Sequence, residues 1–119
     1  MSKKLVFVFK DVLNGTIKAQ EFLDIVMMAA AFDLSVSLVF IGDGAYALLK
    51  NQNTEQINSK NILPIMQALS IYDINNIFVD ETSLQERAIL AERIIPQVSP
   101  ITRAKAQFKI SSADHVFSF

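Results

Sequence analysis

Residues 36–44 read VSLVFIGDG, and this stretch decides the fold class. Its first six residues are apolar apart from Ser37, and Gly42 and Gly44 then end the run. A strand this apolar is typical of a parallel sheet that is covered by helices on both faces. Because residues 45–49 continue in a helix-like pattern, the stretch indicates the strand, turn and helix of an α/β domain.

The same alternation runs through the rest of the chain. The hydrophobic pattern and the turn residues predict strands at 5–9, 36–41, 76–79, 94–95 and 116–119, and helices at 16–32, 45–49, 62–69, 83–91 and 99–110, with a polar loop at 50–59. Alternating strands and helices predict a three-layer α/β/α domain with a five-stranded, mainly parallel sheet. The 119 residues leave room for a single domain, residues 1–119.

Three local signals refine the later elements. Ser83 followed by Glu86 fits a capping box, which would open the helix there. Pro96 should make the fourth strand short or place it at an edge, since proline lacks a ladder donor. The Ser99-Pro100 pair is typical of a helix start, with serine as N-cap and proline at the first helical position.

Composition excludes several classes of function. The net charge is −1, so no broad basic surface favours direct binding of nucleic acid. The chain has no cysteine, which rules out disulfides, thiolate metal sites and a cysteine nucleophile or persulfide on it. We find no apolar run long enough for a signal peptide or membrane span, so we expect a cytoplasmic protein without membrane contact. Apolar residues make up 51% of the chain and charged ones only 19%, which favours an oligomer.

The predicted helix at 16–32 departs from the amphipathic pattern near its end. Met27, Met28 and Ala31 project away from the apolar stripe that should face the core. Either a neighbouring loop covers them, or they form a subunit interface, since methionine adapts well to irregular partner surfaces. We carry both interpretations and name these residues as a candidate interface.

Gly42-x-Gly44-x-x-Ala47 satisfies the glycine spacing of a dinucleotide-binding turn. The spacing follows the second strand, however, and no acidic residue stands about 20 positions further on to hold a ribose. The favoured interpretation is a tight turn in which Asp43 caps the following helix. We therefore predict no bound cofactor.

Acidic residues are predicted where open parallel sheets place their ligand crevices, beyond the carboxyl ends of the strands. Asp11 follows the first strand, Asp43 the second and Asp80 the third, so these three form a candidate crevice. They could perform acid–base chemistry or bind a small ligand, but solvated loop acids are the favoured interpretation. His115, the one histidine, is expected to be structural or solvent-facing, and no spacing predicts a metal site.

The last predicted helix carries three basic residues, Arg103, Lys105 and Lys109. Such a group is usually a solvated face, and the alternative is a surface that docks an acidic partner.

Together these stretches resemble the TusC/DsrF family, small DsrE/DsrF/DsrH-like subunits of sulfur-relay complexes. The resemblance covers essentially the whole chain. It is carried by LVFVF at 5–9, Gly15-Thr16, EFLD at 21–24, FIGDG at 40–44, Leu48-Leu49, Gln52, LSIYDI at 69–74, SLQER at 83–87 and the final Phe119. One departure is Ala88, where we expect glycine after Arg87, and another is Ala19-Gln20 in the first helix.

The resemblance implies a DsrEFH-like domain that assembles with TusB-like and TusD-like sister subunits into a heterohexamer. In that family a cysteine of the TusD-like subunit carries persulfide sulfur, which passes to a TusE-like carrier and finally to 2-thiouridine at the tRNA wobble position. Val79 aligns near that cysteine. Since this chain has no thiol, it should be a non-catalytic accessory subunit that meets the carrier through the TusD-like subunit.

Three alternatives remain open. A DsrF-like subunit in dissimilatory sulfur oxidation would use the same fold and assembly. A free-standing domain could bind a small ligand in the crevice. A hydrolase acting through the acids is the least favoured, because no nucleophile motif accompanies them.

Overall fold

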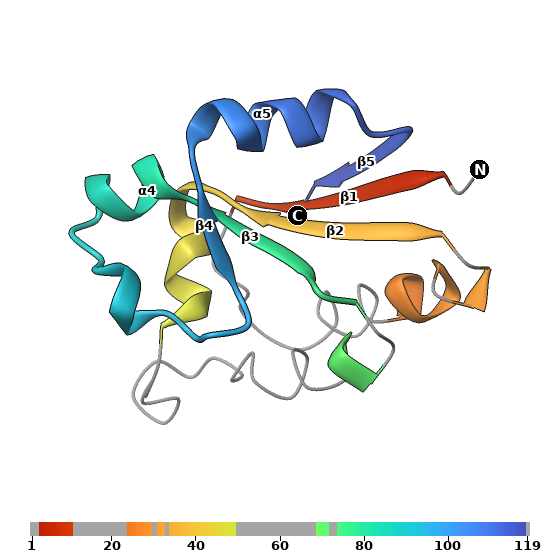
Figure 1. Ribbon diagram of the computed structural model, residues 1–119, viewed down its shortest axis with the longest axis horizontal. Coiled ribbons are helices and arrows are strands. Elements are labelled where there is room, and N and C mark those ends of the chain that lie inside the picture. The colour runs from red at the N-terminus through yellow and green to blue at the C-terminus, as the bar shows by residue number, and fades with distance from the viewer. Residues whose placement is uncertain are drawn as a thin grey trace.

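The computed structural model describes residues 3–10, 24–29, 31–32, 34–49, 69–71 and 74–118. Its strands are β1 (Lys4–Phe9), β2 (Ser35–Phe40), β3 (Asn76–Asp80), β4 (Ser99–Ile101) and β5 (His115–Ser118). They form one five-stranded sheet in the order β4-β3-β2-β1-β5, and every neighbouring pair is parallel. The α/β prediction is confirmed, and the sheet is wholly parallel where a mainly parallel one was predicted (Figure 1).

Each face of the sheet carries its own apolar cluster. Strand residues alternate between the faces, so that Phe7 and Phe9 of β1 join the larger cluster, while Val6 and Val8 join the smaller one. Helix α5 (Arg103–Ser111) covers the smaller cluster with its buried Ala106. The remaining helices lie on the opposite side of the sheet or beside its end, which gives the three layers (Figure 1).

Two predicted elements around residues 94–103 are wrong. Residues 99–101 form the edge strand β4, and α5 begins at Arg103 with Thr102 as its N-cap, accepting a 3.2 Å hydrogen bond from the Lys105 N–H. Pro100 has no backbone N–H to donate to a neighbouring strand, and this is tolerated because β4 lies at the edge of the sheet. Ile94 forms only an isolated antiparallel bridge with Leu49, so no strand begins at 94–95.

Helix α4 (Glu81–Glu86) begins earlier than the capping-box prediction, because Asp80 is the N-cap and Ser83 lies inside the helix. At its other end the Ile89 N–H bonds the Leu84 carbonyl and the Ala88 N–H bonds the Gln85 carbonyl. These are the two hydrogen bonds of a Schellman C-cap, whose central residue is usually glycine. Ala88 takes the left-handed conformation there, with φ of 53°, which explains why glycine was expected.

The glycines at 42 and 44 make the predicted tight turn into a 3-10 helix, η1 (Gly42–Leu48). Gly42 has φ of 55°, and a Cβ on Gly44 would lie 2.2 Å from the Phe9 carbonyl oxygen. The helix cap prediction is wrong: Ile41 is the N-cap without a side-chain bond, and Asp43 instead forms an ion pair with Arg87 at 3.0 Å. A second η element, η2 (Ala91–Arg93), follows α4.

Other predicted elements are covered in part. The helix predicted at 16–32 is helical over 24–29 and at 31, and residues 69–71 are helical at the end of the one predicted at 62–69. The loop at 50–59 and Asp11 lie outside the described residues. Within the described part of the chain, no helix has the length and apolar character needed to cross a membrane.

Candidate functional site

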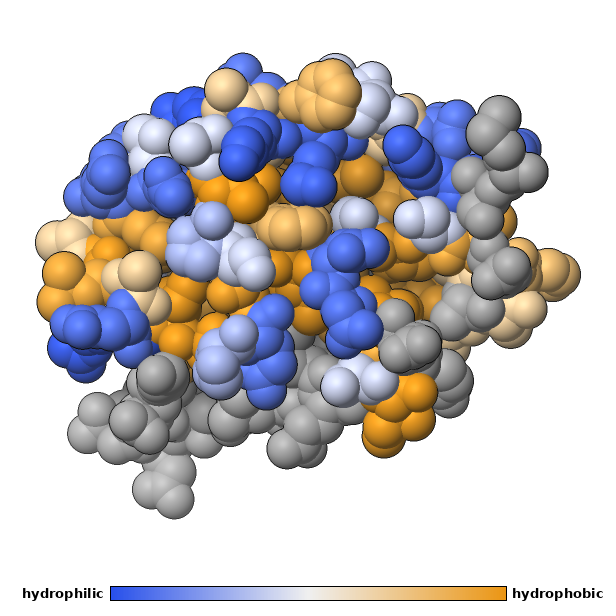
Figure 2. All heavy atoms as spheres, in the orientation of Figure 1, coloured by the Kyte–Doolittle hydropathy of each residue, from blue (hydrophilic) through white to orange (hydrophobic). Residues whose placement is uncertain are grey.

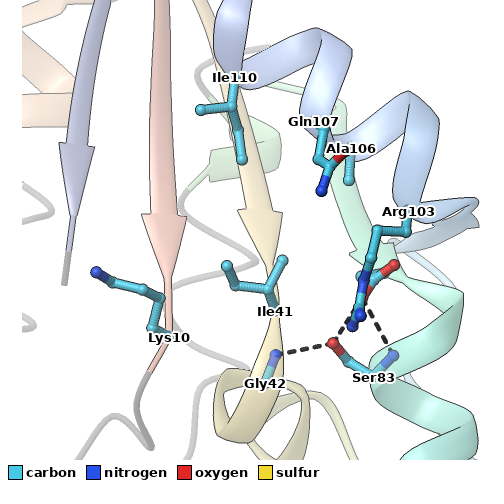
Figure 3. A pocket seen from close by; sticks show the side chains of 9 residues that line it. Lys10, Ile41, Gly42, Ser83, Arg103, Ala106, Gln107 and Ile110 are labelled. Atoms are coloured by element: carbon cyan, nitrogen blue, oxygen red, sulfur yellow. Dashed lines mark hydrogen bonds and ion pairs between the residues drawn. The ribbon is translucent and has the colours of Figure 1, made fainter.

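A pocket of about 390 Å³ lies beyond the carboxyl ends of β1 to β3, under the first turns of α5. We call it the carboxyl-edge pocket, and its described lining residues are Lys10, Ile41, Gly42, Asp80, Ser83, Arg103, Ala106, Gln107 and Ile110. Figure 3 shows Arg103 extending from α5 toward Ser83, Gln107 further along the same helix, and Lys10 on the opposite side of Ile41. Open parallel sheets place their ligand crevices at this end.

Asp80 is the centre of the polar network in this pocket. Although 99% of its surface is buried, one carboxylate oxygen, Oδ2, accepts four hydrogen bonds. Two come from Ser83, at 3.2 Å from the backbone N–H and 2.8 Å from the hydroxyl. The other two come from Arg103, at 3.1 Å from Nε and 2.8 Å from Nη2. The second oxygen, Oδ1, is buried and has no hydrogen-bond partner among the described residues.

The network sets the protonation state of Asp80. Burial raises the pKa of its carboxyl group, but the hydrogen bonds from Ser83 and Arg103 and the positive charge of Arg103 together outweigh burial, so the pKa lies below the ordinary value. The hydrogen bond to Asp80 is in turn the largest cause that raises the pKa of Arg103. Asp80 is therefore an ion-paired carboxylate at neutral pH, which makes it a weak general base.

Two further contacts join this network to its surroundings. The Gly42 N–H donates to the Ser83 hydroxyl oxygen at 2.9 Å, which connects the turn after β2 with α4. Arg103 Nη2 also reaches Glu86 Oε1 at 3.1 Å, on the exposed side. One guanidinium thus holds β3, α4 and α5 together at the carboxyl edge.

The three predicted crevice acids do not form a cluster in the described structure. Asp80 lines the pocket, but Asp43 is exposed, is paired with Arg87 and does not line it. Asp11 lies outside the described residues. His115 pairs with Leu5 near the start of β1, at the opposite end of the strand from the pocket. Among the described residues no group of His, Cys, Asp and Glu side chains could hold a metal ion.

Val79 and Asp80 face opposite sides of the sheet. Val79 is fully buried in the larger apolar cluster, whereas Asp80 lines the pocket on the face that α5 covers. Strand alternation allows only one of two successive residues to address a given face. Of these two positions, only position 80 therefore faces this pocket.

Sequence reasoning missed the role of Arg103, which it treated as part of a solvated or partner-docking face. In the structure Asp80 pairs with Ile101 across β3 and β4, and Arg103 follows two positions later. That register brings the guanidinium to Asp80, and it could have been anticipated only by recognising residues 99–101 as a strand. Lys109 is also engaged, with Nζ 4.2 Å from the centre of the Phe78 ring.

The candidate interface on the first helix is exposed. Met27 is 37% exposed and Met28 62%, and Ala31 is exposed as well. Phe32, immediately after the helix, is 71% exposed. Figure 2 shows hydrophobic atoms at the right margin of the molecule, where Figure 1 places this helix segment, and hydrophilic atoms over α5.

The fold and the pocket define a class: a small, wholly parallel α/β domain with an ion-paired carboxylate at its carboxyl edge. Residues 3–119 match the sequence pattern of the DsrE/DsrF-like family, and the chain belongs to this family. It is 34% identical to a TusC homologue from Aliivibrio fischeri over 98% of both chains. It is 31% identical to the intracellular sulfur oxidation protein DsrF of Allochromatium vinosum, covering 98% of this chain and 96% of the relative.

A solved structure supports the fold. The YchN protein of E. coli superimposes with a TM-score of 0.70 over the full length of both chains, at 19% sequence identity. At this identity the likeness concerns the fold alone. The predicted TusC/DsrF resemblance and the DsrEFH-like fold are thus both confirmed.

Proposed function

We propose that this chain is a TusC-like, non-catalytic subunit of a sulfur-relay complex that passes persulfide sulfur toward 2-thiouridine formation at the tRNA wobble position. The observation that carries the proposal is similarity along nearly the whole chain to relatives named TusC and DsrF. A further TusC, from Buchnera aphidicola, is 31% identical over 98% of this chain. The proposed site of action is the cytoplasm.

The chemistry of the chain supports an accessory role. A persulfide requires a thiolate, and the sequence contains no cysteine. In the pocket, position 80 holds a carboxylate that is already bonded to Ser83 and Arg103. This network joins three elements, so its evident contribution is to the shape of the carboxyl edge.

The proposed partners are TusB-like and TusD-like sisters in a heterohexamer, with a TusE-like carrier that docks on the TusD-like subunit. The exposed apolar side chains of Met27, Met28 and Phe32 support an interface there, because monomeric proteins rarely expose several large apolar groups together. Met27, Met28 and Ala31 are the residues that we assign to a sister contact.

A DsrF-like role in sulfur oxidation is the second candidate, favoured by the 31% identity to DsrF. The carboxyl-edge pocket separately supports a free-standing ligand-binding domain, since its volume of about 390 Å³ lies within the range of small-molecule sites. A saturable rise in melting temperature with a nucleotide or flavin would favour this last candidate over the relay subunit.

Native mass spectrometry of the chain, alone and co-expressed with the products of its neighbouring genes, tests the proposal. We expect a heterohexamer that contains two cysteine-bearing sisters. An assembly of this chain alone that ignores those neighbours would contradict a relay role. If the heterohexamer forms, deletion of the gene followed by measurement of tRNA 2-thiouridine separates the thiolation role from the oxidation role.

A further inference from the structure

The sheet face under α5 is polar at its amino-terminal end. In parallel sheets both faces are normally apolar and covered. The opposite face follows this rule at the same level, because Leu5, Val36 and Ile77 are buried there. Under α5, by contrast, the corresponding positions are Lys4, Ser35, Ser37 and Asn76.

The strand register brings these four side chains together. Lys4 pairs with Ser35 across β1 and β2, and Ser37 pairs with Asn76 across β2 and β3. Paired residues on parallel strands lie about 4.8 Å apart, and i and i+2 on one strand about 6.6 Å apart on the same face. The four groups therefore occupy a small quadrilateral on a rigid surface.

A groove of about 260 Å³ lies over this quadrilateral. We call it the amino-edge groove, and its described lining residues are Lys4, Val6, Ser35, Ser37, Asn76, Phe108, Lys109 and Ser112. Lys109 enters from α5, and its ammonium is held 4.2 Å from the centre of the Phe78 ring. Since Phe78 follows Asn76 on the same face of β3, this contact places a cation beside the polar quadrilateral.

The groove has hydrogen-bond donors to spare. The carboxylate of Asp114 lies nearby and accepts a 2.7 Å hydrogen bond from the backbone N–H of Lys4, but it does not line the groove. Among the described residues, hydrogen bonds reach only the backbone of Lys4 and of Lys109, and the side chains of Lys4, Ser35, Ser37, Asn76 and Lys109 make no hydrogen bond or ion pair. The described lining also contains two ammonium groups and no carboxylate. The carboxyl-edge pocket differs, because there the charge of Arg103 is balanced by Asp80 and Glu86.

We propose that the amino-edge groove binds a tetrahedral oxyanion, a phosphate or sulfate group, between Lys4 and Lys109 and over the hydroxyls of Ser35 and Ser37. Two ammonium groups, two hydroxyls and an amide supply the donors that the oxygens of such a group require. Phe108 stands at the rim, 70% exposed, where it can contact an organic group attached to the anion. This inference is independent of the sulfur-relay proposal, and neither test depends on the other.

The test is a titration of the full chain with inorganic phosphate at constant ionic strength. Binding is detected by calorimetry and by changes in the backbone amide signals in NMR. We expect saturable binding, with the largest shifts at Ser35, Ser37 and Asn76. Lys109→Gln should weaken binding at least 10-fold and Ser37→Ala several-fold. Lys105→Gln is the matched control, because Lys105 is exposed on the same helix, carries the same charge and does not line the groove.

Three results would overturn the proposal: no saturation, equal weakening by Lys105→Gln and Lys109→Gln, or shifts centred on Lys10 and Arg103 instead. A parallel titration with adenosine monophosphate identifies the source of the anion. A phosphate ester is indicated if the nucleotide binds more tightly than inorganic phosphate and Phe108→Ala removes the difference. A free oxyanion is indicated if the two bind equally and both require Lys109.

Discussion

The guanidinium of Arg103 donates two hydrogen bonds to a single oxygen of Asp80, 23 residues earlier in the chain, from Nε at 3.1 Å and from Nη2 at 2.8 Å. Through this contact the start of α5 is fixed to the end of β3. Asp80 is buried whereas Arg103 is half exposed, so removal of Arg103 would be the costly change, because it would leave a desolvated and unpaired carboxylate.

The stability of the domain should depend on the ionisation of Asp80. Its folded-state pKa lies below the ordinary value of 3.8, so its contribution is fully present above that value and is lost as pH falls through the folded-state pKa. Asp80→Asn lacks this contribution and should lower the free energy of unfolding by about 2 kcal/mol at pH 7.

Urea unfolding of both proteins from pH 7 to pH 2 checks this prediction. The difference between wild type and Asp80→Asn should be constant above about pH 5 and shrink below about pH 4. A difference that grows as the pH falls would show that the carboxylate does not stabilise the folded state.

The two glycines of the β2 turn should respond differently to alanine. Gly42→Ala introduces a Cβ with ordinary contacts at 3.6 Å but a left-handed backbone, at a cost of about 1 kcal/mol. Gly44→Ala places a Cβ 2.2 Å from a backbone oxygen of β1, so the strand or the turn must move, and we expect a loss of about 3 kcal/mol. Chemical denaturation of the pair measures both, and an equal loss would argue against the close approach of the turn to β1.

Ala88→Gly should stabilise the protein. Alanine is strained in the left-handed conformation at the end of α4, whereas glycine adopts it freely. After the greater flexibility of glycine in the unfolded chain is subtracted, we expect a gain of about 0.5–1 kcal/mol. Thermal and urea unfolding measure the change, with Ala104→Gly in the first turn of α5 as a control that should destabilise. A loss of stability in Ala88→Gly would mean that the Schellman end of α4 is not formed in solution.

Met28→Lys should weaken assembly with the sister subunits and leave the isolated fold almost unchanged. The side chain is 62% exposed in the single chain, so lysine is tolerated there, whereas an assembled interface would bury its charge. Native mass spectrometry of the co-expressed complex gives the fraction assembled, and Leu90→Lys, at a comparably exposed position of 59%, serves as the control. Normal assembly of Met28→Lys would remove this residue from the interface.

Much of the fold follows from local pattern. The sequence predicted three strands to within about one residue of their observed bounds, at 5–9, 36–41 and 76–79. It also predicted that Met27 and Met28 point away from the core, as they do. Both predictions rest on periods of 2 and 3.6 residues, which can be recognised from consecutive side chains. Glycine was expected at 88 from the family resemblance, and Ala88 does adopt the left-handed conformation that glycine favours.

The errors arose where two local signals competed. Ser99-Pro100 and Thr102 are both acceptable helix starts, and only the pairing of Ser99 with Phe78 across β3 and β4 decides between them. Ser83 likewise resembled an N-cap, yet Asp80, the last residue of β3, is the N-cap of α4. Sequence alone cannot rank such neighbours, because the deciding contacts come from distant strands.

By itself, then, the sequence determined the parallel α/β class, the family and the absence of a thiol on this chain. Tertiary structure decided which side chains meet: Arg103 with Asp80 at the carboxyl edge, and Lys4 with Ser35, Ser37 and Asn76 at the amino edge. The reason is physical. Periodicity assigns each residue to a face, but the register between strands and the docking of α5 depend on packing between segments that are far apart in the chain.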